Sequence, residues 1–444
     1  MKKEIANWGN YPVIESDEKS FSFTDEIEEY VKTEGEFIPR GNGRCYGDAS
    51  LASNTISTLR YNKTLSFDTN KGIFDCQSGL TLDKVLEVIV PKGWFLPVTP
   101  GTKFITVGGA VASDVHGKNH HIDGSFSHHI IEMDVILASG EMITCSSSLY
   151  TDLFWATCGG MGLTGVITRV KFDLKKIETV YIRQKQLKAK NLEEVITFFE
   201  KYKEYTYSMA WIDCLTKGAN FGRSILMLGE HASLNELTEK QKDRPLEIPK
   251  KMQLTFPFNL PSWILNTFTV KVFNFLYYAK NFKREINNIV PYEPFFYPLD
   301  AIHHWNRGYG KKGFVQYQFV LPLQSKEGLK EILNMISNKG LGSFLAVLKV
   351  FGKQDDLISF PMEGYTLALD FPIRNGLFAF LDELDQVVLN YGGRLYMSKD
   401  ARMNPAVLKA GYKQLPRFIE VVKKYNPEGK IRSLQSDRLF LTTN

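Results

Sequence analysis

The chain has 444 residues, 43% of them hydrophobic, and a formal net charge of +5. This length exceeds what one hydrophobic core usually serves, so two domains are expected, and mixed charges without arginine-rich runs argue against a nucleic-acid partner. The five unevenly spaced cysteines argue against a disulfide framework, and without a signal-peptide pattern or an apolar run of about 20 residues a cytoplasmic or membrane-peripheral protein is expected.

The first informative segment is the loop RGNGRCYGD, residues 40–48. Glycine lets a backbone turn sharply, and consecutive free N–H groups can form a nest around a phosphate. The dinucleotide fingerprint of the doubly wound fold needs glycine at its first, third and sixth positions, but Tyr46 occupies the sixth. A diphosphate loop of another kind and an ordinary surface turn therefore both remain open.

A helix is predicted over Thr81–Val90, because its apolar residues recur on one face. The glycine-rich segment 97–129 follows and contains five of the eight histidines. A zinc site on His116, His120 and His121 is a weak hypothesis, since Gly117 and Gly124 argue against a helix and the HExxH signature is absent. The alternative is a backbone-lined slot for a flat aromatic cofactor, with donors from His116 and Lys118.

A third glycine-rich turn lies within residues 153–174, before an alternating strand. Three such turns in about 180 residues suggest that one long ligand contacts several of these loops. Short apolar stretches and helices in this part of the chain indicate an α+β domain.

The segment 257–282 is rich in aromatic residues and leucine, with lysines spaced along it. It is too interrupted to cross a bilayer. Burial in the protein core is the simpler interpretation, and a mobile flap that contacts a lipid tail or a membrane surface is the second.

Three alternating strands are predicted at 313–323, 343–352 and 364–373, and they imply a second sheet. Because side chains alternate along a strand, Gln316 and Gln318 share one face of the first strand. In the second strand Lys349 shares a face with Val347. In the third strand Asp370 shares a face with Thr366 and Ala368. Buried polar groups are costly unless they are paired or bind a ligand. This face is therefore either a solvated outer face or the wall of a site.

Several motifs carry a family resemblance. In this order RGNGRCYGD, PGT, VGGAVASD, HGKNHH and FWATCGGMGLTGVI resemble the PCMH-type FAD-binding domain of the vanillyl-alcohol-oxidase superfamily. Downstream, PLD, WNRGYG, QYQFVLP, DFPI and GGRLYMSKDAR are similar to one family within it, the decaprenylphosphoryl-β-D-ribose 2-oxidases, the oxidative subunits of a 2′-epimerase. The resemblance implies a two-domain α+β fold: an FAD-binding domain over 1–183, a substrate-binding domain with an antiparallel sheet over 184–393, and a C-terminal return to the FAD-binding domain over 394–444.

The resemblance also implies a reaction. The 2′-hydroxyl of a polyprenylphosphoryl-β-D-ribose would be oxidised to a ketone, the first half of epimerisation to the arabinose donor for cell-wall arabinan. An NAD(P)H-dependent reductase would then act on the keto sugar, and a peripheral membrane contact is a further hypothesis. FAD would be bound without a covalent link, because Arg44 stands where covalent members have histidine.

The implied site has three sets of residues and no metal. Lys399 would stabilise charge at the flavin N1/O2 edge with Tyr396 nearby, and the choice of base between Lys349 and His116 is open. The implied cofactor-binding residues are Arg40, Gly41, Asn42, Gly43, Arg44, Cys45, Tyr46, Gly47, Pro100, Gly101, Thr102, Gly108, Gly109, Ala112, Ser113, Gly117, Asn119, Gly162, Gly165, Val166, Ile167 and Lys399. The implied substrate-binding residues are Lys118, Trp211, Phe296, Gln316, Gln318, Lys349, Ala368 and Asp370.

The sequence departs from the family pattern at two positions. Ala368 replaces an active-site cysteine and Phe296 replaces a tyrosine. Inhibitors that capture that thiol are therefore expected not to label this protein. The rival hypotheses are an FAD-dependent oxidase of free sugars, alditols or aldonolactones, a flavin-binding or assembly protein without turnover, and, more distantly, a zinc hydrolase.

Overall fold

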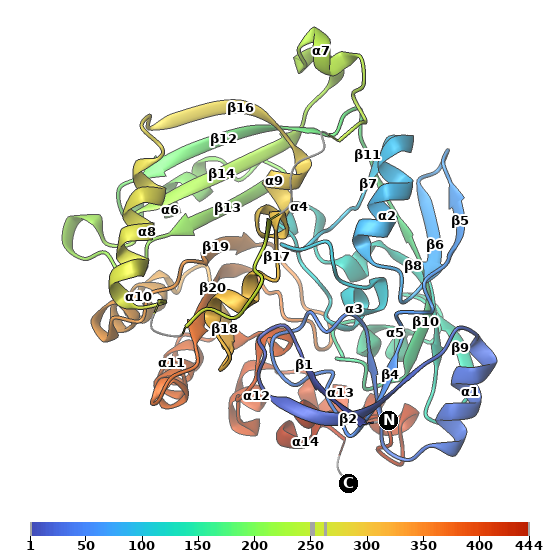
Figure 1. The fold of residues 1–444 in the computed structure, drawn as a ribbon. Helices are drawn as coiled ribbons and strands as arrows, with labels where there is room; N and C mark the ends of the chain where they lie inside the picture. Colours follow the sequence, from blue (N-terminus) through green and yellow to red (C-terminus); the bar gives the residue numbers. More distant parts are fainter. Residues whose placement is uncertain (1, 249–253, 262–263, 443–444) are drawn as a thin grey trace.

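The computed structural model describes residues 2–248, 254–261 and 264–442. Helices and mostly antiparallel sheets are mixed along the chain, which confirms the α+β prediction (Figure 1). No helix of the described residues is long and apolar enough to cross a bilayer.

An eight-stranded antiparallel sheet dominates the later part of the chain. The strands in spatial order are β16 (Glu285–Pro291), β12 (Tyr181–Ala189), β14 (Ser224–His231), β13 (Tyr207–Ile212), β19 (Ala346–Phe351), β20 (Gly364–Pro372), β18 (Phe314–Pro322) and β21 (Arg394–Leu395). One face is apolar and packs against α6 (Leu192–Lys201), α10 (Lys326–Lys339) and α11 (Leu377–Asn390). The three strands predicted from period-two alternation, β18, β19 and β20, are confirmed.

The register of these strands aligns the polar residues on the other face of the sheet. Gln316 pairs with Asp370, Gln318 with Ala368, and Lys349 with Thr366. Successive residues of a strand point to opposite faces, so these six side chains share one face, as the sequence predicted.

Two smaller sheets form the N-terminal part. The first has the order β1 (Lys2–Ala6), β2 (Val13–Ser20), β4 (Asn54–Ser57) and β3 (Ile38–Arg40). The second has the order β5 (Thr64–Asp68), β6 (Ile73–Gln77), β10 (Val166–Asp173), β8 (Ile130–Ile136) and β9 (Met142–Cys145). The accompanying helices are α1 (Thr24–Thr33), α2 (Leu82–Ile89), α3 (Val107–Ala112), α4 (His120–Asp123) and α5 (Thr151–Thr157).

Short elements complete the fold. Two-stranded pairs are formed by β7 (Trp94–Phe95) with β11 (Lys175–Lys176), and by β15 (Leu254–Thr255) with β17 (Ile302–His303). The remaining α-helices are α7 (Glu239–Lys242), α8 (Thr267–Ala279), α9 (Tyr292–Phe296), α12 (Pro405–Gly411), α13 (Leu415–Tyr425) and α14 (Leu434–Leu439).

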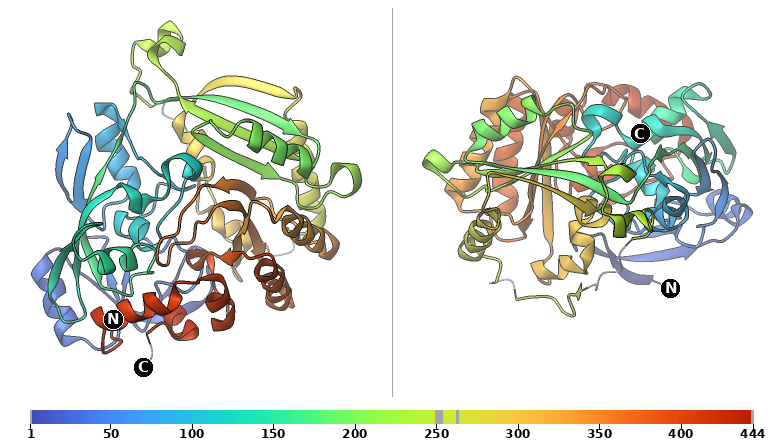
Figure 2. Two further views of the ribbon diagram at one scale, coloured as in Figure 1. Left: turned by 180° about the vertical axis from the view of Figure 1, so that it is seen from behind. Right: turned by 90° about the horizontal axis from the view of Figure 1, so that it is seen from above.

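The C-terminal segment after β21 lies against the N-terminal part (Figure 2). Ile431 forms a parallel bridge with Phe37, which precedes the glycine loop, and α13 packs on α5. The two ends of the sequence therefore contribute to one body of packed elements around this loop.

Three local predictions can be compared with these elements. The helix predicted over Thr81–Val90 is confirmed as α2, in which Leu82, Val85, Leu86 and Ile89 are buried. The argument that Gly117 and Gly124 exclude a helix is wrong in part, because the single turn α4 lies between them.

The burial predicted for 257–282 is also wrong, since α8 buries only Val270 and Asn274. Residues 262–263 of that segment lie outside the described residues.

Candidate active site

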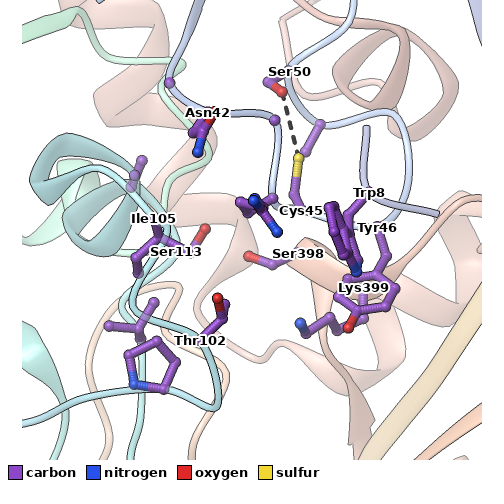
Figure 3. Close-up of a pocket in the computed structure, with 18 of the residues that line it drawn as sticks. Trp8, Asn42, Cys45, Tyr46, Ser50, Thr102, Ile105, Ser113, Ser398 and Lys399 are labelled. Carbon is purple, nitrogen blue, oxygen red and sulfur yellow. Dashed lines mark hydrogen bonds between the residues drawn. The ribbon is translucent and has the colours of Figure 1, made fainter. Parts of the chain in front are cut away.

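One cavity of about 310 Å³ lies between the glycine-rich turns and the polar face of the large sheet. The loop 40–46 and segments around residues 101, 109 and 162 line one side. The other side is lined by Gln316, Gln318, Lys349 and Ala368, with Lys399 between them and the loop. Figure 3 shows side chains from these segments converging on one space.

The loop after β3 presents unpaired backbone donors to this cavity. Within the described residues, the N–H groups of 41–45 donate to no protein acceptor. The ends of the loop are fixed, because Trp8 N–H donates to the Cys45 carbonyl oxygen at 2.9 Å and Tyr46 N–H to that of Ser398 at 3.0 Å. Gly43 has a positive φ of 57°, which favours glycine. The loop therefore has the donor arrangement of an anion nest.

The Arg44 side chain lies over the Trp8 ring, 3.9 Å from its centroid. Burial lowers the pKa of this guanidinium, and Asp300, which also lines the cavity, counteracts that effect. Because arginine remains protonated even so, Arg44 adds a fixed positive charge beside the free amides.

The second glycine-rich turn leaves room for a ligand at the backbone. A Cβ atom built on Gly101 would meet nothing within 4 Å, whereas one built on Gly108 would lie 2.9 Å from the Ser78 Cβ. Gly101 therefore borders open space and Gly108 permits close packing. The Thr106 side chain accepts a hydrogen bond from Gly109 N–H at 3.1 Å and thereby caps α3.

The polar wall of the sheet is organised around Gln318 and Lys349. Gln318 Nε2 lies 3.1 Å from His116 Nε2 and 3.3 Å from Thr366 Oγ1, and the buried His116 Nδ1 has no hydrogen-bond partner among the described residues. Burial, and then the charge of Lys349, lowers the pKa of His116 well below its ordinary value. Burial, with Lys118 and Lys399 nearby, lowers the pKa of Lys349 to about 7.

Lys399 lies across the cavity from Lys349, beside the loop 40–46. Its Nζ is 4.0 Å from the centroid of the Tyr46 ring, and burial lowers its pKa to about 8 while Asp370 opposes the shift. Burial raises the pKa of Asp370 to about 7, although Gln316 donates to its Oδ1 at 2.5 Å. Tyr396 donates to the Ser113 carbonyl oxygen at 2.8 Å and stacks on Phe360.

Most of the predicted site residues line the cavity, but eight do not: Gly47, Gly117, Asn119, Val166, Lys118, Trp211, Phe296 and Asp370.

Close packing explains the four of these that were assigned to the cofactor. A Cβ on Gly47 would lie 1.6 Å from the Asp400 carbonyl oxygen, and one on Gly117 would lie 2.4 Å from Asn119 Oδ1. Asn119 donates to Pro97 and Asp123, and Val166 is fully buried in β10.

The four substrate residues outside the cavity have protein partners. The Lys118 ammonium donates to the Phe296 carbonyl oxygen at 3.1 Å, and burial lowers its pKa to about 7. Trp211 donates to the Phe344 carbonyl oxygen at 3.2 Å, and Asp370 accepts a hydrogen bond from Gln316 at 2.5 Å. These residues support the wall from outside the cavity.

The structure also adds residues that the sequence did not single out. Trp8 and Trp305 line the cavity although both are distant in sequence from the glycine-rich turns. The WNRGYG motif was the only sequence signal for Trp305. Other additional lining residues are Pro39, Ala49, Ser50, Thr58, Ser78, Ile105, Thr106, Val115, Met161, Leu299, Asp300, Leu345, Val347 and Ser398.

The cavity has the donor set that a flavin dinucleotide requires. Free amides and Arg44 can hold a diphosphate, glycine-lined backbone admits a flat ring, and Lys399 provides a cation at the other end. The described residues hold no cluster of three or more metal-ligating side chains.

Comparisons with known proteins agree with this donor set. A family model described as "FAD binding domain" matches residues 24–146. Decaprenylphosphoryl-β-D-ribose oxidase of Mycolicibacterium smegmatis is 38% identical over 412 residues, which cover 91% of this chain and 89% of that protein. An uncharacterised protein of Streptomyces coelicolor is 31% identical and is covered over its whole length.

A further relative matches a shorter part of the chain. Cytokinin dehydrogenase 2 of Arabidopsis thaliana is 31% identical over 136 residues, 30% of this chain and 27% of that protein. The FAD-binding family model and the match to an oxidase together identify FAD as the cofactor of this chain. The chain belongs to the decaprenylphosphoryl-β-D-ribose oxidase family of FAD-dependent oxidoreductases.

Proposed function

We propose that this protein oxidises the 2′-hydroxyl of a polyprenylphosphoryl-β-D-ribose to the 2′-keto sugar. One observation carries the proposal: a single cavity joins the amide-rich loop 40–46 to a sheet face that bears Lys349 and Gln318. The match to the mycobacterial enzyme extends over both parts.

We further propose the domain division that the sequence suggested: FAD-binding over 1–183, substrate-binding over 184–393 and a C-terminal return over 394–444. The separate sheets of the two halves support it, as does the packing of α13 on α5. Each domain would then supply one side of the cavity.

FAD is proposed to bind without a covalent link, because Arg44 stacks on Trp8 and offers no nucleophilic nitrogen comparable to a histidine ring. When bound, FAD would supply the acceptor for the hydride of the sugar carbinol carbon. The amides of 41–45 and Arg44 would hold its diphosphate, and Lys399 would place a positive charge at its polar ring edge.

Lys349 is the proposed general base. As the side chains are placed here, the Gln318 amide nitrogen donates to His116 Nε2, so the proton of the neutral His116 ring resides on Nδ1. That ring has no free acceptor for a substrate proton. The pKa of about 7 leaves a large neutral fraction of Lys349 near neutral pH, and that amine can accept the hydroxyl proton.

The rival function is oxidation of free sugars, alditols or aldonolactones. A putative D-arabinono-1,4-lactone oxidase of Neurospora crassa is 29% identical, but over only 133 residues, 30% of this chain. This likeness covers less than a third of either protein, so it carries less weight for the substrate than the match to the mycobacterial enzyme over 91% of this chain.

The test is anaerobic mixing of the purified holoenzyme with a polyprenylphosphoryl ribose. We expect the flavin absorbance to bleach with this substrate and to persist with free ribitol or arabinono-lactone. Bleaching by the free polyol alone would establish the rival function. Persistent colour with every substrate would favour a flavin-binding protein without turnover.

A keto sugar needs a second enzyme to become the arabinose epimer. We propose an NAD(P)H-dependent keto-sugar reductase as this partner, because the ketone must gain a hydride on the opposite face. Adding such a reductase to the reaction would then yield the arabinose sugar, whereas the oxidase alone would accumulate the ketone.

A further inference from the structure

Helix α8 exposes an apolar stripe to solvent. Phe268, Val272, Phe275 and Leu276 are 73%, 42%, 59% and 61% exposed. Their spacing places them on one face of the helix. Such a contiguous apolar patch marks an interaction surface, whereas single exposed apolar residues need no explanation.

The opposite face of α8 is fixed to the sheet. Buried Asn274 donates to Asp213 Oδ1 at 2.8 Å, and Tyr278 donates to the Ala189 carbonyl oxygen at 3.2 Å. The Asn266 side chain caps the first turn by accepting from two backbone N–H groups. The helix is therefore held at the periphery of the large sheet (Figures 1 and 2). Its stripe is exposed to solvent.

The charge around the stripe has one sign. The sequence contains no aspartate or glutamate from 248 to 284. Lys271, Lys280 and Lys283 are exposed and form no ion pair with any described residue, whereas Arg284 pairs with Glu194. Phe282, between two of these lysines, is 93% exposed. Apolar side chains beside unpaired lysines fit an anionic lipid surface.

A chain of aromatic contacts connects α8 with the cavity. The Phe273 ring stacks on Tyr277, whose centroid is 4.7 Å from that of Trp211. Trp211 pairs in register with Val347, which lines the cavity. An apolar path thus runs from the exposed helix to the wall that carries Lys349.

We propose that the exposed face of α8, with Phe282 and the three unpaired lysines, docks the protein on an anionic lipid bilayer. This surface extends the proposed function, which requires a lipid-linked substrate. A second copy of the chain is a poorer occupant, because a two-fold interface through this face would bring the lysines against themselves.

The experiment is co-sedimentation of the full-length holoenzyme with vesicles in the absence of substrate. Vesicles of phosphatidylcholine alone are compared with a phosphatidylcholine–phosphatidylglycerol mixture. Phe275→Ser/Leu276→Ser removes part of the stripe, and Lys271→Glu/Lys280→Glu/Lys283→Glu reverses the charge. Leu65→Ser/Leu149→Ser is the matched control, since these residues are similarly exposed away from α8.

We expect binding to the anionic vesicles that weakens with salt, and at least a tenfold loss in both α8 variants but not in the control. In the α8 variants, the flavin absorbance and its bleaching by detergent-solubilised substrate should be the same as in the wild type. A failure of membrane docking can therefore be distinguished from a failure of the proposed function. No binding by the wild type, or equal binding by the α8 variants, would overturn the proposal. The proposal would also be overturned if the protein bound no vesicles but formed a concentration-dependent dimer that the α8 variants abolish.

Discussion

At the scale of single residues, the surroundings of two lysines give them different properties. Lys349 faces other cations and has its pKa lowered to about 7, whereas Lys399 lies near Asp370 and keeps a pKa of about 8. Between these values Lys349 is mostly neutral and Lys399 mostly charged. One cavity can thus combine a neutral amine on the sheet wall with a fixed cation from the C-terminal segment.

These two pKa values predict a bell-shaped pH dependence of kcat/KM. Activity should rise as pH passes about 7, because the neutral Lys349 amine is the reactive form, and fall above about 8, where Lys399 loses its charge. Initial rates across this range, at constant ionic strength, provide the measurement. A profile that is flat between pH 6 and 9 would contradict both assignments.

Replacing the base should remove the acid limb of that profile. Lys349→Met is expected to lower kcat by roughly 10²- to 10⁴-fold while the flavin spectrum is retained, because Lys349 lies on the sheet wall and not in the glycine loop 40–46 that is proposed to hold the diphosphate. Lys353→Met, at a nearby exposed lysine, is the matched control and should keep wild-type rates. A variant at residue 349 that keeps both the rate and the acid limb would exclude Lys349 as the base.

Ala368 allows a prediction by gain of function. It lines the cavity beside Gln318 and Val347 in the strand register, so a thiol at this position would face the ligand. Ala368→Cys should form a covalent adduct with inhibitors that capture a cavity thiol, whereas the wild type should not. The adduct is detected by intact-mass measurement. Both proteins carry Cys45→Ser in this experiment, because Cys45 also lines the cavity. An adduct on the wild-type chain would refute the expectation.

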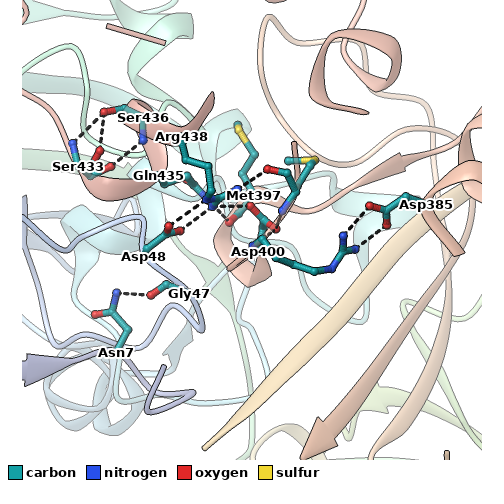
Figure 4. A network of polar contacts seen from close by, with 12 residues as sticks. Asn7, Gly47, Asp48, Asp385, Met397, Asp400, Ser433, Gln435, Ser436 and Arg438 are labelled. Atoms are coloured by element: carbon teal, nitrogen blue, oxygen red, sulfur yellow. Dashed lines mark hydrogen bonds and ion pairs between the residues drawn. The ribbon is translucent and has the colours of Figure 1, made fainter. Parts of the chain in front are cut away.

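At the scale of elements, the glycine loop is held by the C-terminal helices. Arg438, on α14, pairs with Asp48 at 2.8 Å and with Asp400 at 2.9 Å (Figure 4). Asn7 donates to the Gly47 carbonyl oxygen at 2.8 Å. The shape of the loop thus depends on residues about 390 positions away in the sequence.

Removing the arginine should therefore destabilise the protein. Arg438→Met leaves the nearly buried carboxylates of Asp48 and Asp400 without their shared cation, so a loss of about 3–5 kcal/mol of unfolding free energy is expected. Arg432→Met, which breaks more exposed pairs with Glu36 and Asp437, should cost no more than about 1 kcal/mol per pair. Denaturant unfolding compares the two, and equal losses would show that the network has no special role.

The sequence predicted individual helices and strands better than it predicted which other parts of the chain pack against them. Alternation identified β18, β19 and β20 and the shared face of Lys349 and Gln318, because period two fixes the side of a side chain. Hydrophobicity alone could not predict that α8 is exposed, since burial depends on which elements cover a helix. No sequence pattern around Trp8 indicates that it lines the cavity, because its position there depends on how the two ends of the chain pack together.

At the scale of the whole molecule, the cavity is assembled from distant segments. Its lining includes Trp8 from the N-terminal part, Lys349 from the large sheet and Lys399 from the C-terminal segment. Covalent connectivity alone does not hold these walls together. A ligand that contacts all three segments is therefore expected to stabilise the whole fold.

Removal of FAD tests this coupling and the non-covalent linkage together. A ligand that binds only the folded state at about a hundredfold excess over its Kd adds about 2.7 kcal/mol, so the apoprotein should melt several degrees lower and recover on addition of FAD. FMN should restore less of the thermal stability, because it lacks the diphosphate that the free amides of 41–45 would hold.

Heat denaturation should release the flavin into the supernatant. A flavin retained by the precipitated chain would contradict non-covalent binding, and equal melting of the apo and holo forms would contradict the coupling of the three walls.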